Sequence, residues 1–150
     1  MSLSMLSTGI PEFDRILRGL IAGDNVVFRG NSIVDYRKFV IPFVQHGHET
    51  ARPIVYFRYG KHQPLLKETD VSTYATVTPD EGFEPFISQV HQVIKSTERR
   101  AFYVFDRLSD LSITWFSDTM LCNFFMLTCP YLFDRGDLAY FFLDRSQHTP

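Results

Sequence analysis

The sequence has little cysteine, little tryptophan and no excess of either charge. Two of its 150 residues are cysteines, one is tryptophan, and 15 basic residues stand against 17 acidic ones, giving a formal net charge of −2. So balanced a charge argues against binding of nucleic acid or anionic lipid by electrostatic attraction over a broad surface. Cys122 and Cys129 have neither the spacing of a zinc knuckle nor that of a redox C-x-x-C motif, so we expect two reduced and mostly buried thiols.

Other features are missing as well. No apolar run approaches the roughly 18 residues of a membrane helix, and no charged-then-apolar leader opens the chain. There is no internal repeat, charge block or low-complexity tract that would mark a linker. We therefore expect a cytoplasmic protein with no membrane or nucleic-acid partner, folded as a single domain over residues 1–150, with residues 1–3 a possible cloning remnant.

What the sequence does contain is a large apolar and aromatic fraction. Hydrophobic residues make up 45% of the chain and aromatic ones 15%, with 15 phenylalanines, so a substantial core can form. Short apolar runs alternate with stretches of helical periodicity, which predicts an α/β fold with a mostly parallel sheet of about five strands. We expect strands at 26–28, 53–57, 75–78, 101–105 and 138–143, and helices at 11–17, 32–46, 64–68, 83–94 and 115–127.

Capping signals set some of these boundaries. Ser32-x-x-Asp35 and Thr78-x-x-Glu81 have the capping-box spacing, and each is expected to begin a helix. Gly47 is expected to end the first of these helices. The run 101–105 is apolar on both faces, as in a buried parallel strand, and it ends at Asp106.

Two stretches resemble a known family. The segment Thr8-Gly9-Ile10-Pro11-Glu12-Phe13-Asp14 before the first strand is similar to the opening of RecA-like ATPases of the KaiC type. The run 101–106, followed by Leu108-Ser109-Asp110-Leu111, resembles their Walker B strand and its serine-rich turn. The resemblance implies a three-layer RecA-like P-loop NTPase fold in which strand 138–143 inserts between strands 26–28 and 101–105. Strand 26–28 would then lie at an exposed edge, which favours homo-oligomerisation.

The phosphate loop of that family is degenerate in this chain. A functional loop reads G-x-x-x-x-G-K-[ST], and the matching residues are 30–37, of which only Gly30 fits. Asp35 replaces the second glycine, Tyr36 the lysine and Arg37 the magnesium-binding hydroxyl. A carboxylate about 4 Å from a phosphate would repel it by about 4 kcal/mol at an effective dielectric constant near 20. These departures argue against a nucleoside triphosphate in the usual pose.

A second catalytic element is also missing. The family carries an acidic pair after its second strand, and Gly60 and Lys61 stand at those positions here. The general-base contribution of such a pair, roughly 10²–10⁴-fold, is therefore lost. We predict a degenerate ATPase domain with no catalytic residue and no metal site.

A closer resemblance is to the N-terminal region of phosphoenolpyruvate synthase-related proteins, which precedes pyruvate, phosphate dikinase-like nucleotide-binding modules. It is carried by the runs 101–111 and 123–132 and by Tyr56-Phe57-Arg58 with Lys61-His62 and Pro64-Leu65-Leu66. It implies that this chain is a truncated, N-terminal fragment of a larger phosphotransferase. Its function would be that of a non-catalytic scaffold or regulatory module whose partners are the downstream dikinase-like domains.

The residues left of a nucleotide site are Gly30, Asn31, Ser32 and Asp106, which we interpret as vestigial. No cofactor is expected, although weak binding of ATP and magnesium stays open. In one alternative the chain is an active NTPase with an atypical loop, in which Arg29, Arg37 or Lys38 binds phosphate and Asp106 binds magnesium. In another it is a ligand-free oligomerisation or docking domain.

Three further groups have both a functional and a structural interpretation. One is an anion pocket of Arg58, Lys61 and His62, where we favour a solvated loop. The second is the His46 and His48 pair, where we favour an exposed helix end over a metal site. The third is an aromatic group that could bind a partner or belong to the core, formed by Trp115, Phe116, Phe124 and Phe125.

Overall fold

A computed structural model describes residues 6–144 of the chain, so the expected cloning remnant at 1–3 lies outside the described residues. Five strands and five α-helices alternate along these residues, as the hydrophobic pattern predicts. In chain order the elements are α1 (Pro11–Leu17), β1 (Asn25–Gly30), α2 (Ile33–Glu49), β2 (Ile54–Arg58), a 3₁₀ turn η1 (Glu68–Asp70), β3 (Thr73–Thr76), α3 (Phe83–Ser96), β4 (Phe102–Arg107), α4 (Leu108–Trp115), α5 (Asp118–Arg135) and β5 (Leu138–Asp144).

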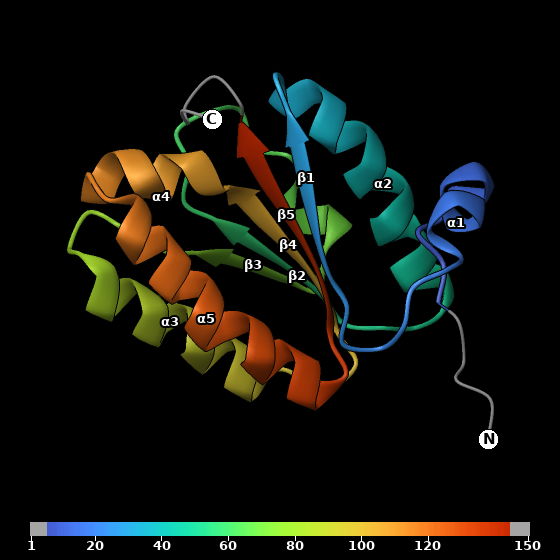
Figure 1. Ribbon diagram of the computed structural model, residues 1–150. Coiled ribbons are helices and arrows are strands. Elements are labelled where there is room, and N and C mark those ends of the chain that lie inside the picture. The colour runs from blue at the N-terminus through green and yellow to red at the C-terminus, as the bar shows by residue number, and fades with distance from the viewer. Residues whose placement is uncertain (1–5, 145–150) are drawn as a thin grey trace.

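The five strands form one sheet in the order β1-β5-β4-β2-β3, and every pairing is parallel. The α/β class is thus confirmed, as is the position of the last strand between β1 and β4 and of β1 at an edge. Helix α2 covers one face of the sheet, while α3, α4 and α5 cover the other, which gives three layers (Figure 1).

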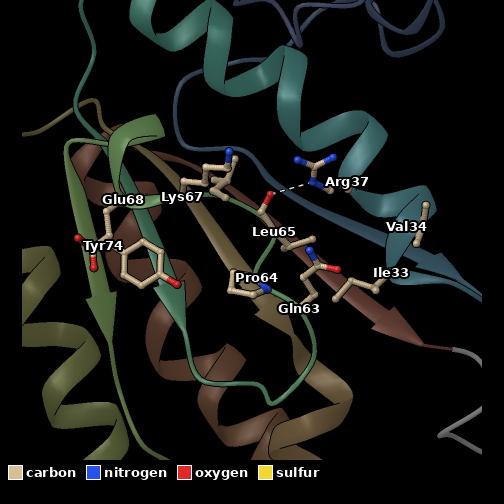
Figure 2. A pocket seen from close by; sticks show the side chains of 10 residues that line it. Ile33, Val34, Arg37, Gln63, Pro64, Leu65, Lys67, Glu68 and Tyr74 are labelled. Atoms are coloured by element: carbon tan, nitrogen blue, oxygen red, sulfur yellow. Dashed lines mark hydrogen bonds between the residues drawn. The ribbon is translucent and has the colours of Figure 1, made fainter.

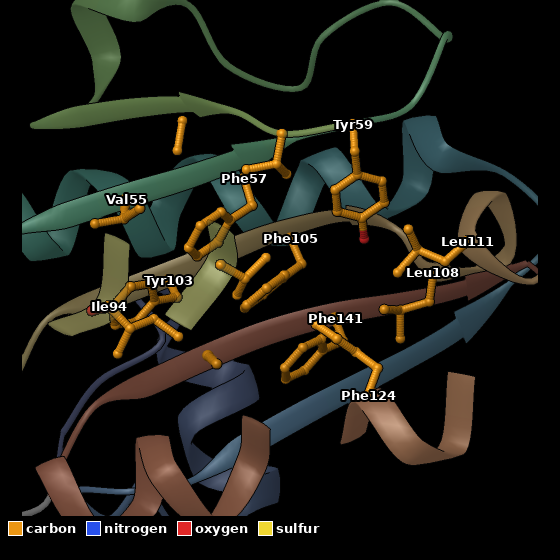
Figure 3. Close-up of a cluster of buried hydrophobic side chains, with 14 of the residues drawn as sticks. Val55, Phe57, Tyr59, Ile94, Tyr103, Phe105, Leu108, Leu111, Phe124 and Phe141 are labelled. Carbon is orange, nitrogen blue, oxygen red and sulfur yellow. The ribbon is translucent and has the colours of Figure 1, made fainter. Parts of the chain in front are cut away.

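Both faces of the central strands are apolar and buried. Strands β2, β4 and β5 contain almost no exposed residue, which explains their continuous hydrophobic runs. On the face toward α3 and α5, the ring of Phe105 stacks between Phe57 and Phe141, with centroids 4.8 and 4.5 Å apart (Figure 3). The phenylalanine-rich composition is therefore used mainly to fill the two core layers.

The Thr8–Asp14 segment, which precedes the sheet, is held together by hydrogen bonds to the Asp14 carboxylate. The Asp14 carboxylate accepts hydrogen bonds from the Thr8 backbone N–H at 2.7 Å, from the Thr8 hydroxyl at 2.6 Å and from the Ser7 hydroxyl. Gly9 has φ +83°, and a Cβ there would lie 2.3 Å from the Pro42 carbonyl oxygen of α2. The sequence motif thus serves to tie α1 to α2, and glycine is the residue that permits the close approach.

Helix α2 does not end at Gly47 as expected. It continues to Glu49, and Gly47 is buried within it. A Cβ at this position would lie 2.9 Å from side-chain atoms of Ile54 and Phe102. The glycine permits close helix–sheet packing and does not act as a stop signal. Ser32 is the N-cap of α2, as expected, since its hydroxyl accepts the Val34 N–H at 3.1 Å, but the expected capping box with Asp35 is not formed, because the Asp35 side chain pairs with Lys38.

The single helix expected over 115–127 is wrong. Residues 108–111, expected as a turn, begin helix α4, which ends at Trp115. Phe116 then adopts a left-handed conformation with φ +53°, and Ser117 caps α5 by accepting the Met120 N–H at 3.1 Å. The two helices pack at an angle that one continuous helix could not give.

Three other expected boundaries differ. Thr78 does not cap α3: its hydroxyl accepts the Asp80 N–H, and the N-cap is Gly82, which makes no side-chain bond. Strand β3 lies two residues before the expected 75–78, and the helical turn expected at 64–68 lies at Glu68–Asp70. Turn and edge segments are set by contacts with the rest of the fold, so local sequence signals specify them poorly.

Two expectations from composition can also be compared with the structure. Among residues 6–144, no helix is both long enough and apolar enough to span a bilayer. Both cysteines are free; Cys122 is exposed and Cys129 is partly buried, so the expectation of two mostly buried thiols is wrong for Cys122. Burial raises the pKa of the Cys129 thiol to about 11, which favours the protonated thiol at neutral pH.

Candidate functional site

The candidate site lies at the carboxyl edge of the parallel sheet. Because all strands run the same way, the segments that follow β1, β2 and β4 meet the end of β5 there. The residues gathered at this edge are those at the expected phosphate-loop positions after β1, the Arg58–His62 segment after β2, the Asp106–Asp110 segment across the end of β4, and Asp144 at the end of β5.

The segment after β1 is too short to wrap a phosphate. Only Asn31 and Ser32 separate β1 from α2, and the Asp35 N–H already bonds to the Ser32 carbonyl at 3.2 Å. A phosphate loop must stay non-helical so that several successive N–H groups point at the anion. Here residues 33–37 are helical, so Gly30, Asn31 and Ser32 form a simple strand-to-helix turn.

Tyr36 fills the space at the lysine position. It is 1% exposed, its hydroxyl donates to the Phe105 carbonyl of β4 at 3.2 Å, and its ring stacks on Phe142 at 5.1 Å. Burial first, and the negative charge of Asp106 second, raise its pKa well above the usual 10, so it stays neutral. A phenol held in the core cannot replace a lysine that reaches a phosphate.

Asp35 and Arg37 lie on the outer surface of α2. Asp35 pairs with Lys38 at 3.6 Å, and both side chains are about two-thirds or more exposed. The expected charge repulsion inside a phosphate cradle is therefore not the obstacle; the cradle itself is missing. Arg37 donates through Nε to the Leu65 carbonyl at 3.0 Å, and Arg29 lies exposed on the edge strand β1.

Asp106, at the Walker B position, is buried and fully engaged by its own chain. One carboxylate oxygen accepts the backbone N–H groups of Tyr59 at 2.9 Å and Gly60 at 3.0 Å, and also Arg58 at 3.2 Å. The other accepts the Tyr56 hydroxyl. Burial and the Asp106 charge raise the pKa of Tyr56, which stays a donor. The carboxylate acts as an internal anchor for the segment after β2.

An extended ion network surrounds this anchor. His62 places Nε2 3.6 Å from an oxygen of Asp106 and 3.6 Å from an oxygen of Asp110, while its Nδ1 faces the Gln63 carbonyl at 2.8 Å. Arg107 bonds Asp110 at 2.7 Å and Asp144 at 3.3 Å. Burial alone would lower the pKa of Arg107, but these two carboxylates raise it above its usual value. The network joins the ends of β2, β4 and β5.

Gly60 and Lys61, where the sequence resemblance would place an acidic pair, lie beside the carboxylate network. A Cβ at Gly60 would lie 2.5 Å from Oδ2 of Asp110 and 2.7 Å from Nε2 of His62. Any side chain at position 60 would push these groups apart, and a carboxylate would also face Asp110 directly. Lys61, the other member of the pair, is exposed. A side chain at position 60 would therefore require the Asp110 carboxylate and the His62 ring to move.

The interpretation of Arg58, Lys61 and His62 as a solvated loop is wrong for two of the three. The side chains of Arg58 and His62 are 14% and 11% exposed and turn inward to Asp106. A cavity of about 490 Å³ adjoins Arg58, and it is lined by residues 58–61, residues 76–80, Arg107 and the α4 residues Asp110, Ile113 and Thr114. Its arginines are neutralised by carboxylates, so Lys61 is the cation left to attract an anion.

A second cavity, of about 480 Å³, lies on the other face beside α2 (Figure 2). Ile33, Val34 and Arg37 of α2 form one wall, the 63–68 segment forms the floor, and Tyr74 of β3 closes the far side. The Arg37–Leu65 hydrogen bond ties the wall to the floor. The lining is mostly apolar, with Arg37 and Lys67 as its cations.

The remaining candidates separate into core and surface. Phe124 is fully buried and Trp115 packs on Phe83 and Phe86, whereas Phe116 is 93% exposed. Phe125 packs partly on Phe141. At the end of α2, His48 contacts the Asp70 carbonyl, and residues 6–144 contain no group of three metal-ligating side chains.

Sequence reasoning identified Asp106 but missed the groups that hold it. Tyr56 lies 50 positions from Asp106, within an apolar run that predicts only a strand, and Tyr59 lies 47 positions away in the segment that follows. Asp110 and Asp144 could have been found, because both follow the ends of predicted strands. Neither models of protein families nor curated proteins match this sequence.

Proposed function

We propose that this chain is a RecA-like module that does not hydrolyse nucleoside triphosphates and that acts as a scaffold or regulatory domain of a larger, phosphoenolpyruvate synthase-related phosphotransferase. The chain itself is not an enzyme in this proposal, and its partners are dikinase-like domains that follow it. The sequence resemblance supplies the family, and the strand order with β5 between β1 and β4 supports it.

The single observation that carries the proposal is the start of α2 at Ile33. With two residues between β1 and α2, there is no loop of free N–H groups for the β- and γ-phosphates. Tyr36 blocks the same region from inside, because it bridges α2 to β4 through the Phe105 carbonyl. Restoring one lysine would not restore the loop.

The state of Asp106 adds independent support. Magnesium keeps several waters and binds carboxylates at near-ideal octahedral geometry, so it needs a carboxylate that faces solvent. Asp106 is fully buried and accepts four donors from its own chain. A rigid edge held by such a network suits a module that positions other domains.

Calorimetric titration of magnesium–ATP into the purified chain, together with a phosphate-release assay, tests this proposal. We expect no saturable heat and no turnover above buffer. Turnover that Asp106→Asn abolishes, in a variant shown by circular dichroism to be folded, would contradict it. Co-purification with the dikinase-like domains encoded downstream tests the scaffold role, and failure of every such domain to bind would remove that role.

A second candidate, nucleotide binding without hydrolysis, is favoured by one observation. Arg37 stands at the wall of the cavity beside α2, where a planar apolar group could lie against Ile33 and Tyr74. This site predicts binding of AMP as well as ATP, because it contacts no γ-phosphate. The Arg37→Gln variant should then weaken the titration heats, whereas Lys38→Gln, one residue along the same helix, should not.

A further inference from the structure

Strand β1 has an unpaired edge with a defined pattern. In residues 6–144 it pairs only with β5, and the Ala139 N–H bonds to the Asp24 carbonyl at 3.2 Å. Pairing groups alternate along a strand, so Asn25, Val27 and Arg29 turn their backbone N–H and C=O groups away from β5. Val27 is 42% exposed and Arg29 is exposed as well. Such an edge is a template for another strand.

Beside this edge lies an apolar flank of α5. Phe28 packs on Phe13 and Phe39 on the α2 face, so the adjacent Val27 points to the α5 face. On that face Phe133 lies against the segment that enters β1, since a Cβ at Gly23 would approach its ring to 2.9 Å.

The flank is also strongly exposed. Phe133 is 63% exposed, and Met126, two turns earlier on the same side of α5, is 73% exposed. The opposite flank of α5 is occupied by α3, where Tyr131 packs on His91. Exposed aromatic and methionine side chains next to an open strand edge are typical of a protein-binding surface.

The edge also carries an unsatisfied acceptor. Oδ1 of Asn25 is buried and has no hydrogen-bond partner among the described residues, although its amide nitrogen contacts the Gly23 carbonyl at 3.4 Å. Four residues along, the Arg29 guanidinium has five donors, and no bonded partner is found for it within residues 6–144. A buried polar atom without a partner costs about 1–3 kcal/mol, so a turn of the partly exposed Asn25 side chain toward a donor from outside would be favoured.

We propose that this edge binds a second copy of the chain, with the two β1 strands antiparallel about a two-fold axis at Val27. In this register Val27 faces Val27 of the second copy, and Asn25 faces Arg29 of the second copy. The three outward-facing residues of each strand then pair completely, and the orphaned Asn25 oxygen gains a donor. The same patch serves both copies, as a closed two-fold dimer requires.

Other registers satisfy the edge less well. A shift by two residues leaves an outward residue unpaired and moves Arg29 away from Asn25. Larger shifts bring the two Arg29 side chains together, where like charges oppose pairing. Arg29 therefore both discourages random edge pairing and selects one register.

The strand ladder alone is too small for a stable dimer. Specific interfaces bury about 1,200–2,000 Å² in total, more than a six-residue strand supplies. The two α5 helices lie on the same face of the joined sheet and flank the axis, so Met126 and Phe133 add apolar area from each copy. This inference does not depend on the proposed function, because no residue of the phosphate-loop region or of the Asp106 network takes part.

Sedimentation velocity over a wide range of concentration tests the dimer. We expect the wild-type chain to sediment as a dimer and Val27→Lys to raise the dissociation constant at least about tenfold, because like charges then meet at the axis. Val34→Lys is the matched control: Val34 is 61% exposed on α2, away from the edge, and the dimer should persist. Circular dichroism confirms that each variant is folded. A monomer at all concentrations, or a dimer indifferent to Val27→Lys, would overturn the proposal.

Cysteine cross-linking tests the register. In a Cys122→Ser, Cys129→Ala background, Val27→Cys should form an inter-chain disulfide on addition of oxidised glutathione, because facing Cα atoms in such a pair lie about 5.5 Å apart. Arg29→Cys is the control, since it faces Asn25 and has no cysteine opposite. Cross-linking of Arg29→Cys and not of Val27→Cys would overturn the two-fold at Val27.

Discussion

The Tyr56 hydroxyl donates a hydrogen bond to the carboxylate of Asp106, and the oxygen of this hydroxyl accepts a hydrogen bond from the backbone N–H of Leu65 at 3.1 Å. One hydroxyl thus joins the end of β4 to the floor of the cavity beside α2. All three groups are buried, so none can turn to water if the hydroxyl is removed. This relationship makes the Walker B position a structural anchor and leads to the first prediction.

The Tyr56→Phe substitution should destabilise the protein by about 2 kcal/mol, because it leaves a buried carboxylate oxygen and a buried N–H each one partner short. Urea denaturation measures the change. Tyr140→Phe is a matched control on the same face of the sheet: that hydroxyl is buried and has no partner among the described residues. Its removal should be neutral or stabilise by up to about 1 kcal/mol. Equal losses in the two variants would contradict the assignment of the Tyr56 bridge.

Asp106→Asn should cost far more than an acid-to-amide change elsewhere. It leaves Arg58 without a counter-ion and places an amide against two backbone N–H donors, for an expected loss of about 3–5 kcal/mol. Asp35→Asn, which breaks an exposed pair with Lys38, should change the unfolding free energy by less than about 1 kcal/mol. Thermal or urea unfolding distinguishes the two, and a small effect at Asp106 would refute the anchor.

Gly9→Ala should be strongly destabilising because the added Cβ meets the Pro42 carbonyl oxygen at 2.3 Å. Gly82→Ala separates this clash from backbone strain. Gly82 also has positive φ, at +107°, but nothing lies within 4 Å of its Cβ position. The Gly82 variant should lose about 1–3 kcal/mol from strain alone, and the Gly9 variant clearly more. Similar losses at the two positions would mean that α1 is not held against α2.

Acid should weaken the hydrogen bonds that the Asp14 carboxylate accepts from Ser7 and Thr8. Burial alone would raise the pKa of Asp14, but the hydrogen bonds from Ser7 and Thr8 and the charge of His46 lower it below the usual 3.8. A depressed pKa stabilises the fold above the unfolded-state pKa, and that contribution is lost as the pH falls through the folded-state pKa.

The measurement is the difference in unfolding free energy between the wild type and Asp14→Asn across a pH series. The difference should be constant at neutral pH and should shrink below pH 3.8. A difference that stays unchanged into the acid range would show that the Asp14 carboxylate gains nothing from Ser7 and Thr8.

The parallel sheet could be predicted from the sequence because its information is local. The runs around Val104 and Phe141 are apolar on both faces, and the intervening stripes have helical spacing. Gly47 and Phe116 show where local signals fail. Gly47 has the residue type of a helix stop but permits close packing of α2 on Ile54. Phe116 ends α4 in a left-handed conformation, which a phenylalanine in the sequence does not predict.

The candidate site was predictable only at its strand ends. Asp106 is visible as the acidic end of an apolar run, but its partners come from another strand about fifty residues away. At residues 35 and 36 the sequence predicts side chains within a loop, whereas these residues belong to the first turns of α2. Helix boundaries differ by one or two residues from what local sequence signals indicate, so the form of this strand-to-helix turn could not be predicted.

The central claim, that no phosphate cradle exists between β1 and α2, is tested most directly by the backbone amide resonances of residues 31–37. In a ¹⁵N–¹H correlation spectrum, saturating magnesium–ATP should leave these resonances unmoved, because the N–H groups of residues 35–37 are helical and Ser32 caps the N–H of Val34. Saturable shifts concentrated on residues 31–37 that inorganic triphosphate, which has no base to occupy the cavity beside α2, produces as well would show that triphosphate oxygens do bind there and would contradict the account.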